Sequence, residues 1–263
     1  MKIIKDGKQL SNIFKTDDRK TMGVIPRLLD KLIKASCNRN TYSCFPHGSA
    51  IFTTGPDGIV EDAPKGIKRV PSGRSVWEAG ANANSERKIR NDYCKRRDDK
   101  KITKKKTTSF VLVSSSCLDG TLKSELAKEF NKEKVFKKIK IYDANDLADW
   151  LCDHLEISVW LLTQYDLNNK EYGIRSLDEE WNIIKQSTSK ELPASIYICG
   201  NENKSGELIS NIKANDYGIL SYSSKYFGKF HAYYFVIASL VQNGDSAISD
   251  RCVVVDNYDS FCL

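Results

Sequence analysis

The sequence lacks the groupings of cysteine and histidine that structural metal sites and disulfide frameworks use. It has only three histidines, and its eight cysteines form no C-x-x-C pair and stand apart from the histidines. Because structural zinc needs several ligands at short, regular spacing, these residues argue against a zinc site. Several cysteines fall inside apolar runs, so we expect reduced and mostly buried thiols, as in a cytoplasmic protein.

Long apolar segments are also missing. No run approaches the roughly 20 residues that a helix needs to cross a bilayer, and the longest candidate is Tyr233–Val241. The first residues, Met1–Asp6, contain no apolar core of a signal peptide. We therefore expect an intracellular, cytoplasmic protein without a membrane partner.

The composition is that of a globular chain with a slight excess of positive charge. The 263 residues are 40% hydrophobic and 29% charged, which is enough for one large domain or two modest ones. Lysine and arginine number 41 against 34 acidic residues, a net charge of +7. An excess of this size is compatible with a nucleic-acid partner but does not require one.

The first two thirds of the chain change from a strand meander to an alternation of strands and helices. Residues 1–20 are polar, and we expect them to be irregular. A meander favours antiparallel pairing, whereas alternation favours parallel pairing. We predict an α/β domain at 1–170 with a mixed central sheet flanked by helices. The predicted strands are 49–53, 58–61, 75–78, 110–113 and 139–142, and the predicted helices are 22–36, 84–97, 122–136, 143–154 and 157–165.

The remaining residues predict a linker at 171–192 and a small second α/β unit at 193–263. The glycine-containing loop Gly200–Gly206 lacks the G-x-x-x-x-G-K-[ST] order of a phosphate-binding loop. The unit is short for a complete parallel sheet, so we expect the chain to be the front part of a larger protein. Its predicted strands are 196–199, 218–222 and 252–255, and its predicted helices are 205–212 and 232–242.

Two acidic residues stand at strand ends in the predicted meander. Asp57 opens one strand and Glu78 ends the next. Neighbouring strands lie about 4.8 Å apart, so the two carboxylates can converge at one end of the sheet. Paired carboxylates suit Mg²⁺, which can polarise a phosphate and activate water. By spacing alone, an aspartate in an Asp57-Gly58 turn and a surface glutamate are the favoured interpretation over a metal site.

Several segments in a fixed order carry a family resemblance. They are Ile25–Leu29, Phe45–Gly48, Asp57–Glu61, Val70–Glu78, Asp92–Arg96 and Tyr142–Leu151. Together they resemble the PD-(D/E)XK nuclease domains of the restriction-endonuclease-like, Mrr-like type. Such domains stand at the N-terminus of large bacterial proteins, among them antiviral defence NTPases of the STAND type.

The resemblance implies that Asp57 and Glu78 are catalytic and bind Mg²⁺ or Mn²⁺. The sequence departs from the family where an acid-x-Lys order is usual, because Glu78-Ala79 is followed by Gly80. A lysine from the following helix can take that place, with Lys95 as the first candidate and Lys88 as the second. Both lysines could instead be solvated residues on a helix surface.

A second departure, Pro56 in place of the usual Trp, alters only the turn. Glu61 could add a further carboxylate, and Trp77 is expected to face the core. The run Lys100–Lys106 suits contact with phosphates, although it could also be a solvated loop. The residues predicted to contact nucleic acid are Arg74, Ser75, Lys88 and Arg96.

By resemblance, the expected function is a metal-dependent endonuclease that hydrolyses DNA in bacterial antiphage defence. DNA is the expected substrate, and self-association through a downstream NTPase region is the expected trigger. The alternative is a nuclease fold without activity that serves as a nucleic-acid-binding or oligomerisation scaffold. The missing strand lysine motivates this alternative.

Overall fold

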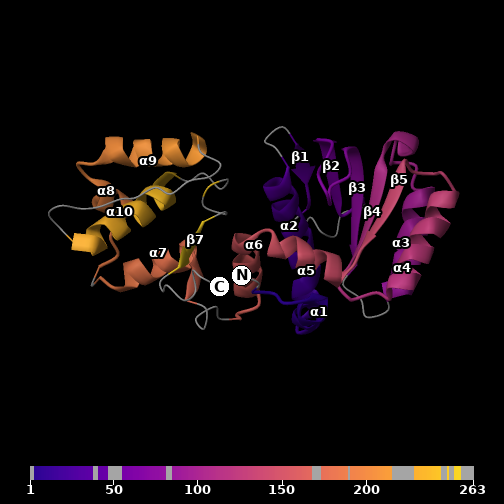
Figure 1. Ribbon diagram of the computed structural model, residues 1–263, viewed down its shortest axis with the longest axis horizontal. Coiled ribbons are helices and arrows are strands. Elements are labelled where there is room, and N and C mark those ends of the chain that lie inside the picture. Colours follow the sequence, from indigo (N-terminus) through magenta and orange to yellow (C-terminus); the bar gives the residue numbers. More distant parts are fainter. Residues whose placement is uncertain are drawn as a thin grey trace. The chain divides into compact units, whose positions relative to one another are not determined.

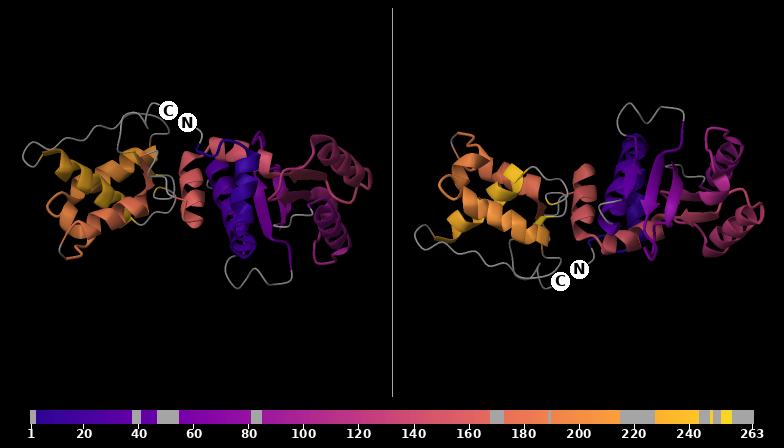
Figure 2. Two further views of the ribbon diagram at one scale, coloured as in Figure 1. Left: turned by 90° about the horizontal axis from the view of Figure 1, so that it is seen from below. Right: turned by 90° about the horizontal axis from the view of Figure 1, so that it is seen from above.

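The chain divides into two compact units, Met1–Tyr165 and Asp166–Leu263, which are treated separately below (Figure 1, Figure 2). The structure is a computed structural model. It describes residues 3–37, 41–46, 55–80, 85–167, 173–188, 190–214, 228–243, 248 and 252–255.

The first unit is built on a five-stranded mixed sheet whose strands follow one another in chain order (Figure 1). The first three strands pair antiparallel, and the last three pair parallel. The predicted fold class, a mixed sheet flanked by helices, is confirmed. The strands are β1 (Tyr42–Cys44), β2 (Gly58–Ala63), β3 (Gly73–Gly80), β4 (Ser109–Ser114) and β5 (Lys138–Tyr142).

Helices cover both faces of this sheet (Figure 1, Figure 2). On one face lie α3 (Ser85–Asp98) and α4 (Gly120–Lys132), which pack against β3, β4 and β5. On the other face lie α2 (Asp18–Ser36) and α5 (Ala144–Cys152), with α1 (Gly7–Lys15) and α6 (Leu155–Gln164) packed on them. A short 3₁₀ helix, η2 (Lys105–Thr107), precedes β4.

Helix α2 begins earlier than its apolar pattern predicts. Asp17 caps it by accepting a hydrogen bond from the backbone N–H of Lys20 at 2.8 Å. Pro26 therefore lies inside the helix rather than near its start, where it removes one backbone hydrogen bond. The fully buried Leu28, Leu32 and neighbouring apolar residues offset that loss.

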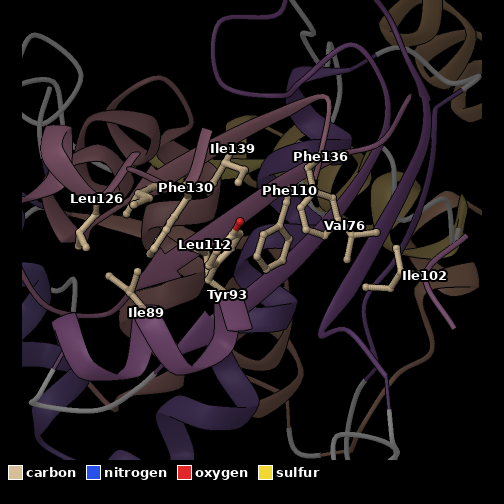
Figure 3. Packing of buried hydrophobic residues seen from close by; sticks show 11 residues of the cluster. Val76, Ile89, Tyr93, Ile102, Phe110, Leu112, Leu126, Phe130, Phe136 and Ile139 are labelled. Atoms are coloured by element: carbon tan, nitrogen blue, oxygen red, sulfur yellow. The ribbon is translucent and has the colours of Figure 1, made fainter. Parts of the chain in front are cut away.

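The two faces of β3 point into different cores. Val76 packs among aromatic residues of the α3 and α4 side, where the rings of Tyr93 and Phe130 stack at 4.1 Å (Figure 3). Trp77 points to the opposite face and contacts Phe45, Tyr142 and Trp150, so its predicted core position is confirmed. Side chains alternate along a strand, and Glu78 consequently faces helix α3.

The beginning of the chain departs from its prediction. The described part of the segment 1–20 is not irregular, because Asp6 caps α1 and the apolar side chains of Leu10, Ile13 and Phe14 are buried. The predicted strand 49–53 lies outside the described residues. Strand β1 at Tyr42–Cys44, which pairs with β2, was not predicted.

The second unit is mainly helical in the residues described. The predicted linker at 171–192 is wrong, because it contains β6 (Ile174–Ser176) and α7 (Leu177–Gln186). A capping box between Ser176 and Glu179 starts α7, whose Leu177 and Ile184 join the core of this unit.

The other elements of this unit confirm the two predicted helices and correct one strand. Residues 196–199, predicted as a strand, largely form the short helix α8, which begins directly after Pro193. Strand β7 pairs antiparallel with β6 rather than in a parallel sheet. The predicted strand 218–222 lies outside the described residues. The elements are α8 (Ala194–Ile198), α9 (Glu202–Ala214), α10 (Gly228–Asn243) and β7 (Val253–Val255).

Within the described segments, no helix combines the length and the apolar character that crossing a membrane would require. The cysteines that the structure describes are all free, as predicted. The expectation that most of them are buried is wrong, because Cys44, Cys94, Cys117 and Cys199 are exposed.

Candidate functional site

The two predicted acids meet at the junction of β2 and β3. Gly58 pairs with Trp77 in this antiparallel register, and one further step places Asp57 opposite Glu78. The backbone N–H of Ala79 donates to Oδ2 of Asp57 at 2.8 Å, which fixes the aspartate against β3. Glu78 is only 3% exposed, whereas Asp57 is half-buried. The predicted convergence of the two carboxylates is therefore present.

Helix α3 presents a row of charged side chains to this junction. Lys88, Asp92 and Arg96 follow one another at four-residue intervals and so share one helix face. Nζ of Lys88 donates to Oδ1 of Asp92 at 2.6 Å. Nε of Arg96 donates to Oε1 of Glu78, and its Nη2 donates to the carbonyl oxygen of Gly55. The arginine thus ties α3 to both strands of the acidic pair.

Two carboxyl groups of this site, those of Glu78 and Asp92, have raised pKa values. Burial raises the pKa of Glu78 to about 8, and the negative charge of Asp57 adds to this, while Arg96 opposes it. Burial also raises the pKa of Asp92, against the effect of its partner Lys88, with Asp57 again contributing. Both shifts arise because the ionised forms are poorly solvated and close to other acids. An additional cation beside Asp57 and Glu78 would stabilise those forms.

Gly80 makes room for the side chain of Lys88. A Cβ atom added at Gly80 would lie 3.1 Å from Cγ and 3.6 Å from Cε of Lys88. The lysine stem therefore passes over Gly80, where the acid-x-Lys order expected from the resemblance would place a lysine. Both residues, with Asp92 and Ser114, line a small pocket between α3 and the ends of β3 and β4.

This geometry reverses the order of the two lysine candidates. Lys95 is exposed, and it affects Asp92 only through its charge. Lys88 is half-buried, lies over Gly80 and contacts Asp92 directly. The lysine best placed to replace the missing strand lysine is Lys88.

Two of the predicted nucleic-acid contacts are wrong because their side chains are buried. Ser75 is 0% exposed, and its Oγ accepts a hydrogen bond from Nε1 of Trp77 at 2.9 Å on the far face of the sheet. Arg96 is 3% exposed and holds Glu78. Arg74 is half-buried and pairs with Glu61 at 2.9 Å. Glu61 on β2 and Arg74 on β3 lie at the other end of this strand pair, so Glu61 does not add a carboxylate to the site.

Asp92 and the role of Arg96 were missed from the sequence. Both stand in the segment that carried the family resemblance, but neither was assigned to the acidic pair. The available pattern was their four-residue spacing with Lys88 on a helix that follows the acidic strand directly.

Asp57 and Glu78 are the donors that a metal ion would use. In the part of the chain that the structure describes, no three residues among histidine, cysteine, aspartate and glutamate are grouped to hold one ion. Two carboxylates are nevertheless a sufficient protein contribution for Mg²⁺, which keeps several waters and binds substrate phosphates. The donor set therefore fits such an ion, provided that Glu78 shares its carboxylate with Arg96.

Comparisons of the chain with protein-family models, with curated proteins and with solved structures find no match.

Proposed function

We propose that the first unit is a metal-dependent nuclease domain that hydrolyses phosphodiester bonds in DNA. The supporting observation is the convergence of Asp57 and Glu78 with Lys88, whose stem passes over Gly80. This arrangement combines paired oxygen ligands with a nearby ammonium group. Both the residue types and their positions agree with what the resemblance to PD-(D/E)XK nucleases implies.

Each side chain has a distinct part in the proposed site. Asp57 and Glu78 would hold Mg²⁺ or Mn²⁺, which polarises a phosphate and lowers the pKa of a bound water. Lys88 would orient that water and stabilise negative charge on the phosphate oxygens. Asp92, at 2.6 Å from the ammonium group, limits the directions in which Lys88 can point. Arg96 fixes the buried carboxylate of Glu78.

The biological setting is proposed from the resemblance. Related domains stand in front of NTPase regions in antiphage defence proteins. We extend to this chain the expectation that a downstream region assembles several copies on one DNA duplex and thereby activates cleavage. The first unit then acts as the effector of a cytoplasmic defence protein.

The test is cleavage of supercoiled plasmid with Mg²⁺ or Mn²⁺. The full chain is assayed alone and fused to a dimeric coiled coil, so that a need for assembly does not hide activity. Asp57→Asn and Glu78→Gln keep the shape of each side chain but remove its charge. We expect each to lose at least about 100-fold in rate. Equal rates for the wild type and both variants, alone and fused, would contradict the proposal.

The Arg96–Glu78 ion pair favours a second candidate, a scaffold without catalytic activity. A guanidinium group already neutralises the buried acid, and so the site could be stable without a metal. Calorimetric titration with Mn²⁺ separates the two. Binding that Asp57→Asn abolishes supports the nuclease, whereas no binding by the wild-type chain supports the scaffold.

A further inference from the structure

A second charged region lies at the end of the sheet opposite the acidic pair. It is formed where the chain enters the parallel strands β4 and β5, and we name it the lysine rim. The end of β3 on this side is Gly73, and the acidic end is Gly80. In the parallel register Lys138 is level with Ser75, which is three residues or roughly 10 Å along β3 from Glu78, and it stands two strands away on β5. Its members are Lys104, Lys106, Lys137, Lys138 and Lys140.

The rim is held together by the backbone. The N–H of Lys137 donates to the carbonyl oxygens of Lys105 at 3.2 Å and Thr108 at 2.9 Å. Its side chain reaches the carbonyl oxygen of Ser72 at 3.4 Å, and Lys138 pairs with Ser109 in the parallel register. These hydrogen bonds join the segments that precede β3, β4 and β5. The backbone positions of the rim lysines are therefore fixed.

The positive charge of the rim is not balanced by nearby acids. Asp98 and Glu133 pair with Arg97, at 2.9 Å and 3.5 Å, and Asp99 pairs with Arg96 at 3.2 Å. Among the residues that the structure describes, no rim lysine forms an ion pair.

Most rim lysines are exposed to solvent, and two of them lie close enough to repel each other. Lys104, Lys106, Lys137 and Lys138 are exposed. Lys140 is half-buried, and burial lowers its pKa, with the like charge of Lys138 adding to the effect. An anion at this place would relieve the repulsion between the two amines.

The chemistry of the rim fits the phosphate backbone of a nucleic acid. Lysine ammonium groups act as point charges that contact phosphates without reading base sequence. Surfaces that bind membranes usually add apolar side chains that enter the lipid. The exposed large hydrophobic residues in the described segments all lie elsewhere: Met22, Tyr42, Leu167, Ile183 and Ile196.

We propose that the lysine rim is a separate binding surface for duplex DNA, which anchors the backbone without regard to sequence and away from the acidic pair. Ile139 and Ile141 share the core of Val76. Lys138 and Lys140 therefore point to the face of the sheet opposite Glu78, and DNA bound here need not enter the acidic site. The proposal holds whether or not Asp57 and Glu78 support cleavage.

The experiment measures how the binding of a labelled 30-base-pair duplex depends on salt. Fluorescence anisotropy is recorded with the full chain in EDTA over a range of KCl concentrations. A rim variant carries Gln at all five rim lysines. A matched control variant loses the same charge elsewhere, with Gln at five other exposed lysines: Lys8, Lys15, Lys128, Lys190 and Lys204.

We expect the rim variant to bind at least tenfold more weakly than the control variant. The slope of log Kd against log KCl should fall by about 4.5, because each of the five lost phosphate contacts contributes about 0.9. The double variant Lys137→Gln/Lys138→Gln should lower it by about 2. The assay in EDTA measures binding without cleavage, so failure of the rim and failure of the nuclease proposal remain distinguishable.

Two results would overturn the proposal. The first is an equal loss in the rim and control variants, both shown to be folded by circular dichroism. The second comes from vesicles containing phosphatidylserine: rim-dependent binding to them, with duplex binding unchanged, would assign the rim to membranes.

Discussion

Glu78 is a buried acid with two charged neighbours. It is 3% exposed, its guanidinium partner Arg96 is equally buried, and Asp57 stands on the next strand. A buried ion pair stabilises a fold little, because desolvating both charges costs about as much as their attraction returns. The raised pKa of Glu78 expresses that cost, and it makes a stability measurement informative about the site.

The first prediction concerns pH. The pKa of Glu78 is about 8 in the folded chain against 4.5 as its ordinary value. The folded state therefore keeps a proton that the unfolded state releases, and stability falls as pH rises from about 4.5 to about 8. The difference in unfolding free energy between Glu78→Gln and wild type should grow across this range by a few kcal/mol. Urea denaturation of both chains at pH 5 and pH 8 measures it, and parallel profiles would contradict the assignment.

The second prediction separates the two lysines. Lys88→Gln should lower metal-dependent plasmid cleavage by about 100-fold or more, because it removes the ammonium group over Gly80. Lys95→Gln is the matched control on the same helix and should cleave at nearly the wild-type rate. Calorimetry should show Mn²⁺ binding by both variants. A larger loss for Lys95→Gln would restore the order that the sequence alone favoured.

At the scale of elements, helices and strands with strong local patterns were predicted well. Strand β4 is a short, fully buried apolar run, and α3 carries a clear stretch of helix-forming residues. Helix α1 was missed because only Leu10, Ile13 and Phe14 mark its buried face within a polar segment. Its stability depends on docking against α5, a contact between segments far apart in the chain.

The third prediction tests this docking. A Cβ atom at Gly7 would lie 2.4 Å from Oδ1 and 2.5 Å from the backbone nitrogen of Asn145. Gly7→Ala should therefore lower the free energy of unfolding by about 1–3 kcal/mol, since backbone atoms must move. Gly120→Ala, where nothing lies within 4 Å of the added atom, should cost nothing. Urea unfolding measures both, and equal effects would show that α1 does not pack tightly on α5.

At the scale of the whole molecule, both proposed sites lie in one unit. The acidic pair, Lys88, Arg96 and the lysine rim all belong to Met1–Tyr165, which has its own sheet and core. Tyr165 is the last residue of this unit. A 2.6 Å hydrogen bond between its hydroxyl group and Oγ1 of Thr21 joins it to helix α2.

The fourth prediction follows from this division. A fragment of residues 1–167 should unfold in one cooperative thermal transition and should bind duplex DNA through the rim as the full chain does. Circular dichroism and anisotropy measure the two properties. A fragment without a cooperative transition would mean that the first unit needs the second in order to fold.

The sequence by itself determined the order of strands and helices from β2 to α6 and the convergence of Asp57 with Glu78. These depend on local periodicity and on turn residues, which can be followed along the chain. Only the tertiary structure decided which positively charged side chains lie beside the acidic residues. One residue turns a helix by about 100°, so the rotation of α3 selects Arg96 over Lys95 as the partner of Glu78. Packing of Ile89 and Tyr93 in the core sets that rotation, and it also carries Lys88 over Gly80.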